Sequence, residues 1–310
     1  MNGPEGVAVA RVADDAPLEE DFEVAAKRQS PWRMTVRRLF RHRLFLMGLG
    51  LCSIILLAGA LAQVITQTDP TRLAMRWRFR APGQDGFIFG TDNFGRSLWS
   101  RVVWGAQLSL YIGFSVVALN AVFGTLIGAA AGYFRRLDNA LMRVNDALMA
   151  FPAILLAIAI TAVLGASTFN AILALSIVYI PRTARIVRAS VLVVREMEFV
   201  QAARASGAGH WRIISRHIMP NCMAPLIVQL SFIFAYAVLS EAVLSFLGLG
   251  APPSIPSWGT MISEGRTYIR EAAWLTIVPG CAIALTVLGL NLMGDGLRDV
   301  LDPRLKIEQG

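Results

Sequence analysis

The sequence contains few charged residues for its length. Aspartate, glutamate, lysine and arginine make up 16% of its 310 residues, against about 25% in typical soluble domains. Hydrophobic residues make up 55%, and the mean hydropathy is +0.55. A water-soluble fold of this size cannot bury so much apolar surface. The sequence therefore predicts an all-α polytopic membrane protein.

Lysine is nearly absent, since only Lys27 and Lys306 occur. A phosphate-binding loop of the form G-x-x-x-x-G-K-[ST] needs a lysine, so none can lie between these two positions. The chain therefore lacks the usual nucleotide site, and any step driven by ATP must use a partner. The other basic residues are arginines between apolar runs, which is typical of topology signals rather than of nucleic-acid binding.

Cysteine and catalytic patterns are also scarce. Cys52, Cys222 and Cys281 lie in or beside apolar runs and form no CxxC or Cys/His cluster, so we interpret them as small hydrophobic residues. The sequence contains no recognisable Ser/His/Asp, paired-carboxylate or metal-ligand pattern. It therefore predicts no catalytic residue, no metal site and no cofactor held by this chain.

Six apolar stretches are long enough to cross about 30 Å of hydrocarbon. The predicted spans are residues 44–65, 105–134, 141–164, 169–187, 222–247 and 272–292. They form a predicted transmembrane domain over 44–300, between an N-terminal tail (1–43) and a C-terminal segment (301–310). Most of the 29 basic residues fall on one side of the membrane if both tails are cytoplasmic, and arginine-rich segments face the cytoplasm.

Residues 93–104 precede the second predicted span and combine apolar with charged side chains. Leu98, Trp99 and Val102 alternate with Arg96 and Arg101. This pattern suits a helix lying at the membrane interface.

The segment 188–220, between the fourth and fifth predicted spans, is too polar to cross a membrane but has helical periodicity. Ala202 and Ala203 are small enough to allow close approach to another surface, and Gly207 allows a sharp turn. Two interpretations remain open. The segment either lies on the bilayer surface or docks as a short helix into a groove of a soluble partner.

Glu241 is the clearest acidic residue within an apolar span. Ionisable groups in the membrane are costly and often functional. A structural role and a place along a solute path both remain open for it, and Asn120 and Gln229 are weaker candidates for that path. The glycines at 124, 128 and 132 form a stripe that allows close helix packing, within this chain or across a dimer.

The segment 198–221 reads EFVQAARASGAGHWRIISRHIMPN and resembles the cytoplasmic EAA loop of binding-protein-dependent ABC permeases. Residues 201–203 take the place of Glu-Ala-Ala, Gly207 that of the motif glycine, and Pro220 that of the closing proline. Gln201 departs from the usual glutamate: it keeps the hydrogen-bonding capacity and loses the charge. The resemblance implies a set of ATPase-coupling residues: Glu198, Gln201, Ala202, Ala203, Gly207, Trp211 and Pro220.

Three further segments resemble motifs of the dipeptide/oligopeptide/nickel permeases. They are FGTDNFGRSLWSRVVWGAQLSL (89–110), SEAVLSFLGLGAPPSIPSWGTMI (240–262) and GDGLRDVLDPRL (294–305). Together with the short basic N-terminal region they are similar to the C-type subunit of that group, over about residues 33–306.

This resemblance implies one subunit of an ATP-driven importer in the bacterial inner membrane. Its partners would be a second permease, two cytoplasmic ATPase subunits that bind ATP and Mg²⁺, and an external solute-binding protein. The expected solutes are dipeptides or oligopeptides, with nickel or another small solute as the alternative. A rival of a different class is a stand-alone secondary transporter, which would require repeated halves and charges at the membrane midplane.

Overall fold

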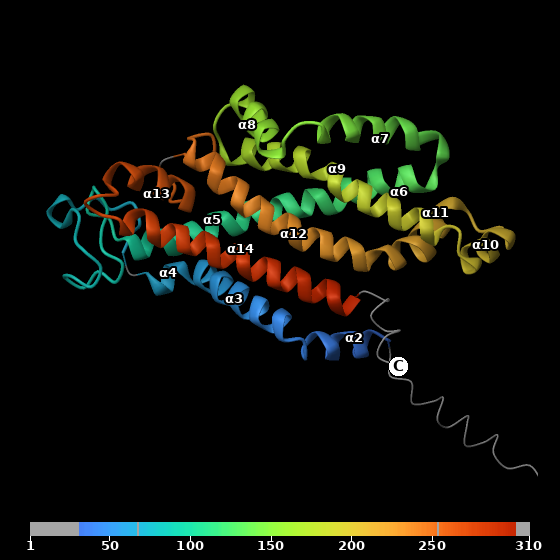
Figure 1. Ribbon diagram of the computed structural model, residues 1–310, viewed down its shortest axis with the longest axis horizontal. Coiled ribbons are helices and arrows are strands. Elements are labelled where there is room, and N and C mark those ends of the chain that lie inside the picture. The colour runs from blue at the N-terminus through green and yellow to red at the C-terminus, as the bar shows by residue number, and fades with distance from the viewer. Residues whose placement is uncertain (1–30, 67, 253, 302–310) are drawn as a thin grey trace, which may run out of the picture.

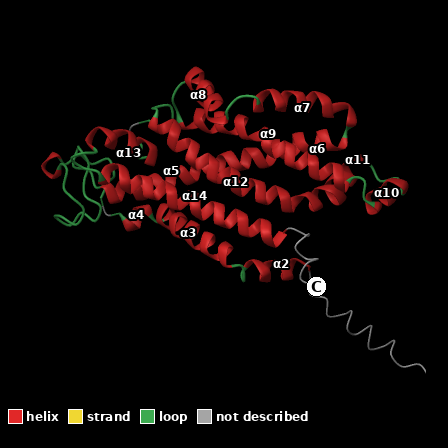
Figure 2. Cartoon of the chain, in the orientation of Figure 1, coloured by secondary structure: helices red, strands yellow, loops and turns green. Residues whose placement is uncertain are grey.

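The computed structural model describes residues 31–66, 68–252 and 254–301. Helices dominate this part of the chain, and it contains no β-strand, only an isolated bridge between Thr91 and Ser97 (Figure 2). The all-α prediction is confirmed. The predicted N-terminal tail and C-terminal segment lie largely outside the described residues.

The α-helices were assigned the following bounds: α2 (Pro31–Leu39), α3 (Arg43–Ala60), α4 (Ala62–Ile65), α5 (Leu98–Leu119), α6 (Thr125–Tyr133), α7 (Arg135–Met149), α8 (Ala153–Leu164), α9 (Thr168–Val194), α10 (Glu198–Ala205), α11 (His210–Ile213), α12 (Met219–Phe246), α13 (Trp258–Gly265) and α14 (Trp274–Leu301). A π-helical turn joins α5 to α6, and a second one joins α11 to α12. Each of these pairs therefore runs on as one long helix.

Four helices in the described part of the chain are long and apolar enough to cross a membrane: Arg43–Ala60, Leu98–Tyr133, His210–Phe246 and Trp274–Leu301. The second and fifth predicted spans thus begin several residues earlier than expected. Arginines near these starts suggested polar boundaries, but the helices continue through them.

The predicted third span, 141–164, is broken. Helices α7 and α8 meet at an angle of 89° across a short break that contains Pro152. Proline lacks an N–H donor and disfavours helical geometry in the residue before it, which explains the interruption. If the bent pair is one span, the structure has five apolar spans in its described residues.

Helix α9 contains the predicted fourth span, 169–187, and is buried among other helices. It packs against α5, α6, α8 and α12, and Ala174, Leu175 and Ala184 are fully buried. This shielding explains how α9 can carry several arginines, because neighbouring helices rather than lipid surround much of it.

The glycine stripe packs within this chain, against α9. A Cβ atom at Gly124, Gly128 or Gly132 would lie 2.6–2.7 Å from side-chain atoms of Thr183, Val187 or Val191. Only glycine therefore permits this close approach of α6 to α9.

The bundle has two distinct ends (Figure 1). We call the end formed by residues 66–97 and 247–273, with α13, the loop end. The opposite end carries α10, and α2 also lies toward it; we call it the α10 end. Helices α5, α12 and α14 run between the two ends.

Candidate functional site

Helix α10 projects from the α10 end and is closed by a complete glycine cap. The N–H of Gly207 donates to the carbonyl of Arg204, and the N–H of Ala208 donates to the carbonyl of Ala203. Gly207 has φ of +78°, the left-handed geometry that this cap requires. Residues 195–197 and 206–209 are the only non-helical parts of the predicted loop 188–220.

The base of α10 is fixed to the bundle. Val200 is fully buried in a cluster with Ile213 and Ile218. Arg195 donates from Nη1 to the carbonyl of Gly132 at 2.6 Å, and the hydroxyl of Tyr133 lies 2.8 Å from Nδ1 of His210. A shift of α10 would therefore displace residues of α6, α9 and α12.

The outer face of α10 is exposed. Glu198, Gln201 and Ala202 are exposed, and Ala203 is half-buried. Two large apolar side chains accompany them, because Phe199 is 42% and Trp211 is 77% exposed. Gln201 donates from Nε2 to the carbonyl of Arg195 at 3.2 Å, so its amide helps to hold the turn before α10.

Pro220 lies in the first turn of α12, two residues after the π-helical turn Ile214–Ile218 and within the continuous helix from His210 to Phe246. Proline cannot donate the hydrogen bond of a regular helix, and a π-helical turn accommodates such a defect.

Two of the predicted path residues are buried between helices of this chain. The carboxylate of Glu241 accepts hydrogen bonds from Ser245 Oγ at 2.6 Å and Ser109 Oγ at 3.2 Å. Asn120 donates to the carbonyl of Val116 at 2.9 Å and faces α9. Both side chains are fully buried, whereas Gln229 is half-buried on α12.

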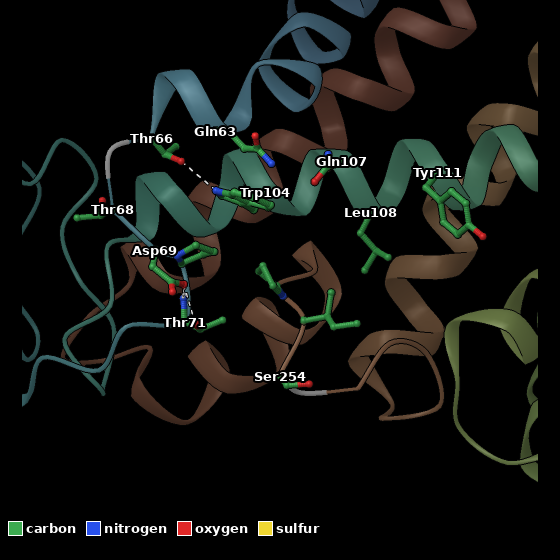
Figure 3. Close-up of a pocket in the computed structure, with 13 residues that line it drawn as sticks. Gln63, Thr66, Thr68, Asp69, Thr71, Trp104, Gln107, Leu108, Tyr111 and Ser254 are labelled. Carbon is green, nitrogen blue, oxygen red and sulfur yellow. Dashed lines mark hydrogen bonds between the residues drawn. The ribbon is translucent and has the colours of Figure 1, made fainter.

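A cavity of about 790 Å³ opens at the loop end. Figure 3 shows α5 forming its wall, with Trp104, Gln107, Leu108 and Tyr111 along one side of the helix. The other lining residues come from 63–71 and from 254–256. Because its walls combine amides, hydroxyls and aromatic rings, the cavity can hold a polar organic solute.

The polar groups of this cavity are organised. Trp104 donates from Nε1 to Thr66 Oγ1 at 2.9 Å, and Thr71 donates from N and Oγ1 to Asp69 Oδ1 at 2.8 and 2.6 Å. The hydrogen bonds from Thr71, aided by the nearby charge of Arg72, lower the pKa of Asp69. The carboxylate is therefore ionised near neutral pH.

Sequence reasoning missed this cavity, because its residues come from three separate segments. One signal could have been found: positions 104, 107, 108 and 111 follow the spacing of a single helix face.

A buried ion network closes the loop end behind the cavity. Arg101 donates from Nη1 to Asp92 at 2.7 Å and to Glu264 at 2.8 Å. Arg96 bridges the same two carboxylates, and the side chain of Arg101 is only 2% exposed.

The structure has no separate helix over 93–104: residues 93–97 are not helical, and 98–104 belong to α5. An interfacial position for these residues stays a prediction. Ser97 caps α5 by accepting from Ser100 N, so the transmembrane helix itself begins at Leu98. Its early arginine is compatible with this start because two acids neutralise it.

The described residues contain no group of three His, Cys, Asp or Glu side chains that could hold a metal ion.

Comparison with known families matches residues 121–307 to the family "Binding-protein-dependent transport system inner membrane component". Residues 30–82 match "N-terminal TM domain of oligopeptide transport permease C". The two matches together cover most of the chain.

Several curated proteins are similar over nearly their whole length. A putative peptide transport system permease protein of Brucella abortus is 57% identical over 280 residues, covering 90% of this chain and 94% of the relative. The dipeptide transport system permease protein DppC of Alkalihalophilus pseudofirmus is 43% identical over 293 residues, covering 94% and 95%. The glutathione transport system permease protein GsiD of Pectobacterium atrosepticum is 39% identical over 280 residues, covering 90% and 93%.

Proposed function

The chain belongs to the binding-protein-dependent transport system inner membrane components, as a C-type permease of the dipeptide/oligopeptide group, and we propose that α10 couples it to ATPase partners. It is a transport subunit of an ATP-driven peptide importer rather than an enzyme. The relatives named for dipeptides and other peptides favour peptides over nickel as the solute.

The observation that carries this proposal is the contrast between the base and the outer face of α10. The base is tied to α6, α9 and α12 through Val200, Arg195 and His210. The outer face presents Phe199, and Trp211 of the following helix, α11, is exposed as well. Large apolar side chains exposed in this way are typical of a surface that a protein partner covers. We assign Glu198, Gln201, Ala202, Ala203 and Gly207 to the same coupling surface.

The coupling mechanism follows from these contacts. ATP and Mg²⁺ bind to the partner ATPases, whose closure shifts α10. Because the base of α10 is packed rather than hinged, the shift passes to α9 and α12. These helices then change the access of the solute path from one side of the membrane to the other.

The proposed assembly contains this chain, a second related permease, two ATPase subunits and an external solute-binding protein. In the proposed orientation, the α10 end and both termini are cytoplasmic and the loop end faces outward. The arginines of α10, α11 and the following turn support this orientation. The cavity at the loop end would then be the vestibule that receives the solute from the binding protein, and Glu241, Gln229 and Asn120 are the proposed polar positions along the path below it.

The test is purification of the chain from its native membrane in mild detergent, followed by reconstitution of what accompanies it. We expect a second permease, ATPase subunits and a binding protein, and dipeptide uptake that requires both ATP and the binding protein. The control is the same complex with a hydrolysis-deficient ATPase. Dipeptide flux through this chain alone, driven by an ion gradient, would instead identify a secondary transporter.

A further inference from the structure

Helix α9 and its C-cap residue, Arg195, together carry four arginines, and Arg182 differs from the other three. Arg185 pairs with Asp146 at 2.6 Å, and Arg188 pairs with Asp138 at 2.7 Å. Arg195 donates to a backbone carbonyl and pairs with Glu196. Arg182 has neither a carboxylate partner nor a hydrogen bond among the described residues.

Two tyrosine rings hold the Arg182 guanidinium instead. Its Cζ atom lies 5.6 Å from the ring centroid of Tyr179 and 5.5 Å from that of Tyr236. The two rings stack on each other, with centroids 6.2 Å apart and planes inclined by 26°. Cation–π contacts of this kind stabilise the charge without using its N–H donors.

The cluster is fixed on one side and open on the other. Tyr179 is 4% exposed, and its hydroxyl lies 2.7 Å from Ser240 Oγ. Tyr236 is 46% exposed, and Arg182 is half-buried. The guanidinium is thus positioned by the protein while its hydrogen-bonding edge remains available.

Arg182 lies within the predicted fourth span, 169–187, in the helix that neighbouring helices surround. It is roughly 20 Å from either end of α9 at 1.5 Å per residue. An unpaired guanidinium within a membrane bundle is costly, so an anion that binds there would recover much of that cost.

We propose that Arg182, held beside the stacked rings of Tyr179 and Tyr236, binds the carboxyl-terminal carboxylate of a peptide as it passes through the importer. This inference rests on the proposed function. The planar guanidinium can bind both carboxylate oxygens at once, and the tyrosine faces accept different neighbouring side chains. Every linear peptide has one such carboxylate, so the site would serve a peptide importer without selecting a sequence.

Gln229 is a second polar residue near this site, on the same helix as Tyr236. It precedes Tyr236 by seven residues on α12, which places both on the same helix face, and it lies closer to the α10 end. We therefore place Gln229 on the α10 side of this site.

The first experiment compares Arg182→Gln with Arg185→Gln in the complete reconstituted importer. We expect Arg182→Gln to reduce uptake of a free dipeptide at least tenfold, Arg182→Lys to retain part of it, and Arg185→Gln to change it less than twofold. For a carboxyl-terminally amidated dipeptide, we expect the Arg182→Gln importer and the unmodified importer to have nearly equal uptake rates. Both importers use the same binding protein, so its preference for one peptide cancels in the ratio of the two rates. An equal loss for both dipeptides would overturn the carboxylate assignment.

A second measurement tests contact directly. Tyr236 is replaced by a photo-reactive phenylalanine, and a radiolabelled dipeptide is supplied through the binding protein. We expect the peptide to be cross-linked, and Arg182→Gln to remove that product, whereas Arg185→Gln should leave it in place. Cross-links to lipid or to the second permease alone would overturn the inference. Failure of the proposed function itself is distinguishable, because the unmodified complex would then show no ATP-dependent uptake.

Discussion

The loop end contains a buried ion network, whereas the α10 end presents exposed side chains. At the loop end, Asp92, Arg101 and Glu264 are joined in a network that is closed within this chain, and Arg101 is almost fully buried. At the α10 end, Glu198 and Trp211 are exposed. This ion network is therefore complete in the single chain, whereas the surface of α10 is available to a partner.

Because of this difference, we expect substitutions at the two ends to cause different defects. A buried ion pair contributes little net stability, but removing one partner leaves an uncompensated charge, with a penalty of about 3–5 kcal/mol. Exposed side chains contribute little to the stability of their own subunit. Substitutions at the loop end should therefore impair folding, and substitutions at the α10 end should impair coupling in a folded protein.

The largest effect is expected for Arg101→Met. Asp92 and Glu264 would lose a buried cation, and we expect a loss of about 3–5 kcal/mol in the free energy of unfolding, measured by thermal unfolding in detergent. The matched control is Arg80→Met, since the pair Arg80–Asp85 belongs to the same region but is more than 40% exposed on both sides. That control should cost at most about 1 kcal/mol. Similar losses of unfolding free energy in Arg101→Met and Arg80→Met would show that the buried network is no more important for stability than an exposed ion pair.

Gly207→Val tests the α10 end, with Gly209→Val as its control. A Cβ atom meets nothing within 4 Å at either position, so crowding is absent from both. The backbone differs, since φ is +78° at Gly207 and −66° at Gly209. Left-handed geometry costs a residue with a side chain roughly 1–2 kcal/mol, so we expect only Gly207→Val to reposition α10.

The measurement for these glycine variants is ATP-dependent uptake in membranes that contain equal amounts of each protein. We expect Gly207→Val to insert normally and lose at least nine-tenths of uptake, whereas Gly209→Val retains most of it. Full uptake in Gly207→Val would argue against a coupling role for the cap of α10.

Local sequence patterns predicted the α10 end better than the loop end. Small residues, a glycine and helical spacing lie together within 198–221. A short helix and its proposed docking role could therefore be predicted from this one segment. The loop end depends on contacts between distant segments, such as Arg101 with Glu264, 163 residues apart. Composition marked those side chains as polar but could not show that they neutralise one another, so the start of α5 was misplaced.

The same reasoning explains why Arg182 was overlooked. In the sequence it lies within the predicted fourth span, 169–187, as the first of several arginines, and their spacing does not separate it from the others. Only the three-dimensional structure distinguishes it, because Asp138 and Asp146 reach its neighbours from α7 while Tyr236 reaches it from α12.

The smallest effect is expected for Asp69→Asn, which tests an exposed charge at the otherwise closed loop end. Thr71 lowers the pKa of Asp69, so the folded pKa lies below the unfolded value of about 3.9. Any stability from this carboxylate is therefore fully present above that value and is lost only as the pH falls through the folded pKa. Between pH 5 and 8 the thermal stability should not depend on this group.

In uptake assays, Asp69→Asn should lower the rate less than about threefold, because an exposed charge attracts a peptide ammonium only weakly in salt. The ratio between variant and unmodified protein should stay constant from pH 5 to 8, since Asp69 does not titrate there. Thr71→Val is the control: it removes the hydroxyl hydrogen bond to Asp69, keeps the backbone one, and leaves an ionised carboxylate over the same range. A ratio that changes steeply near pH 6 would mean that the vestibule carboxylate is protonated during transport, and the loop end would then be less rigidly organised than its ion network implies.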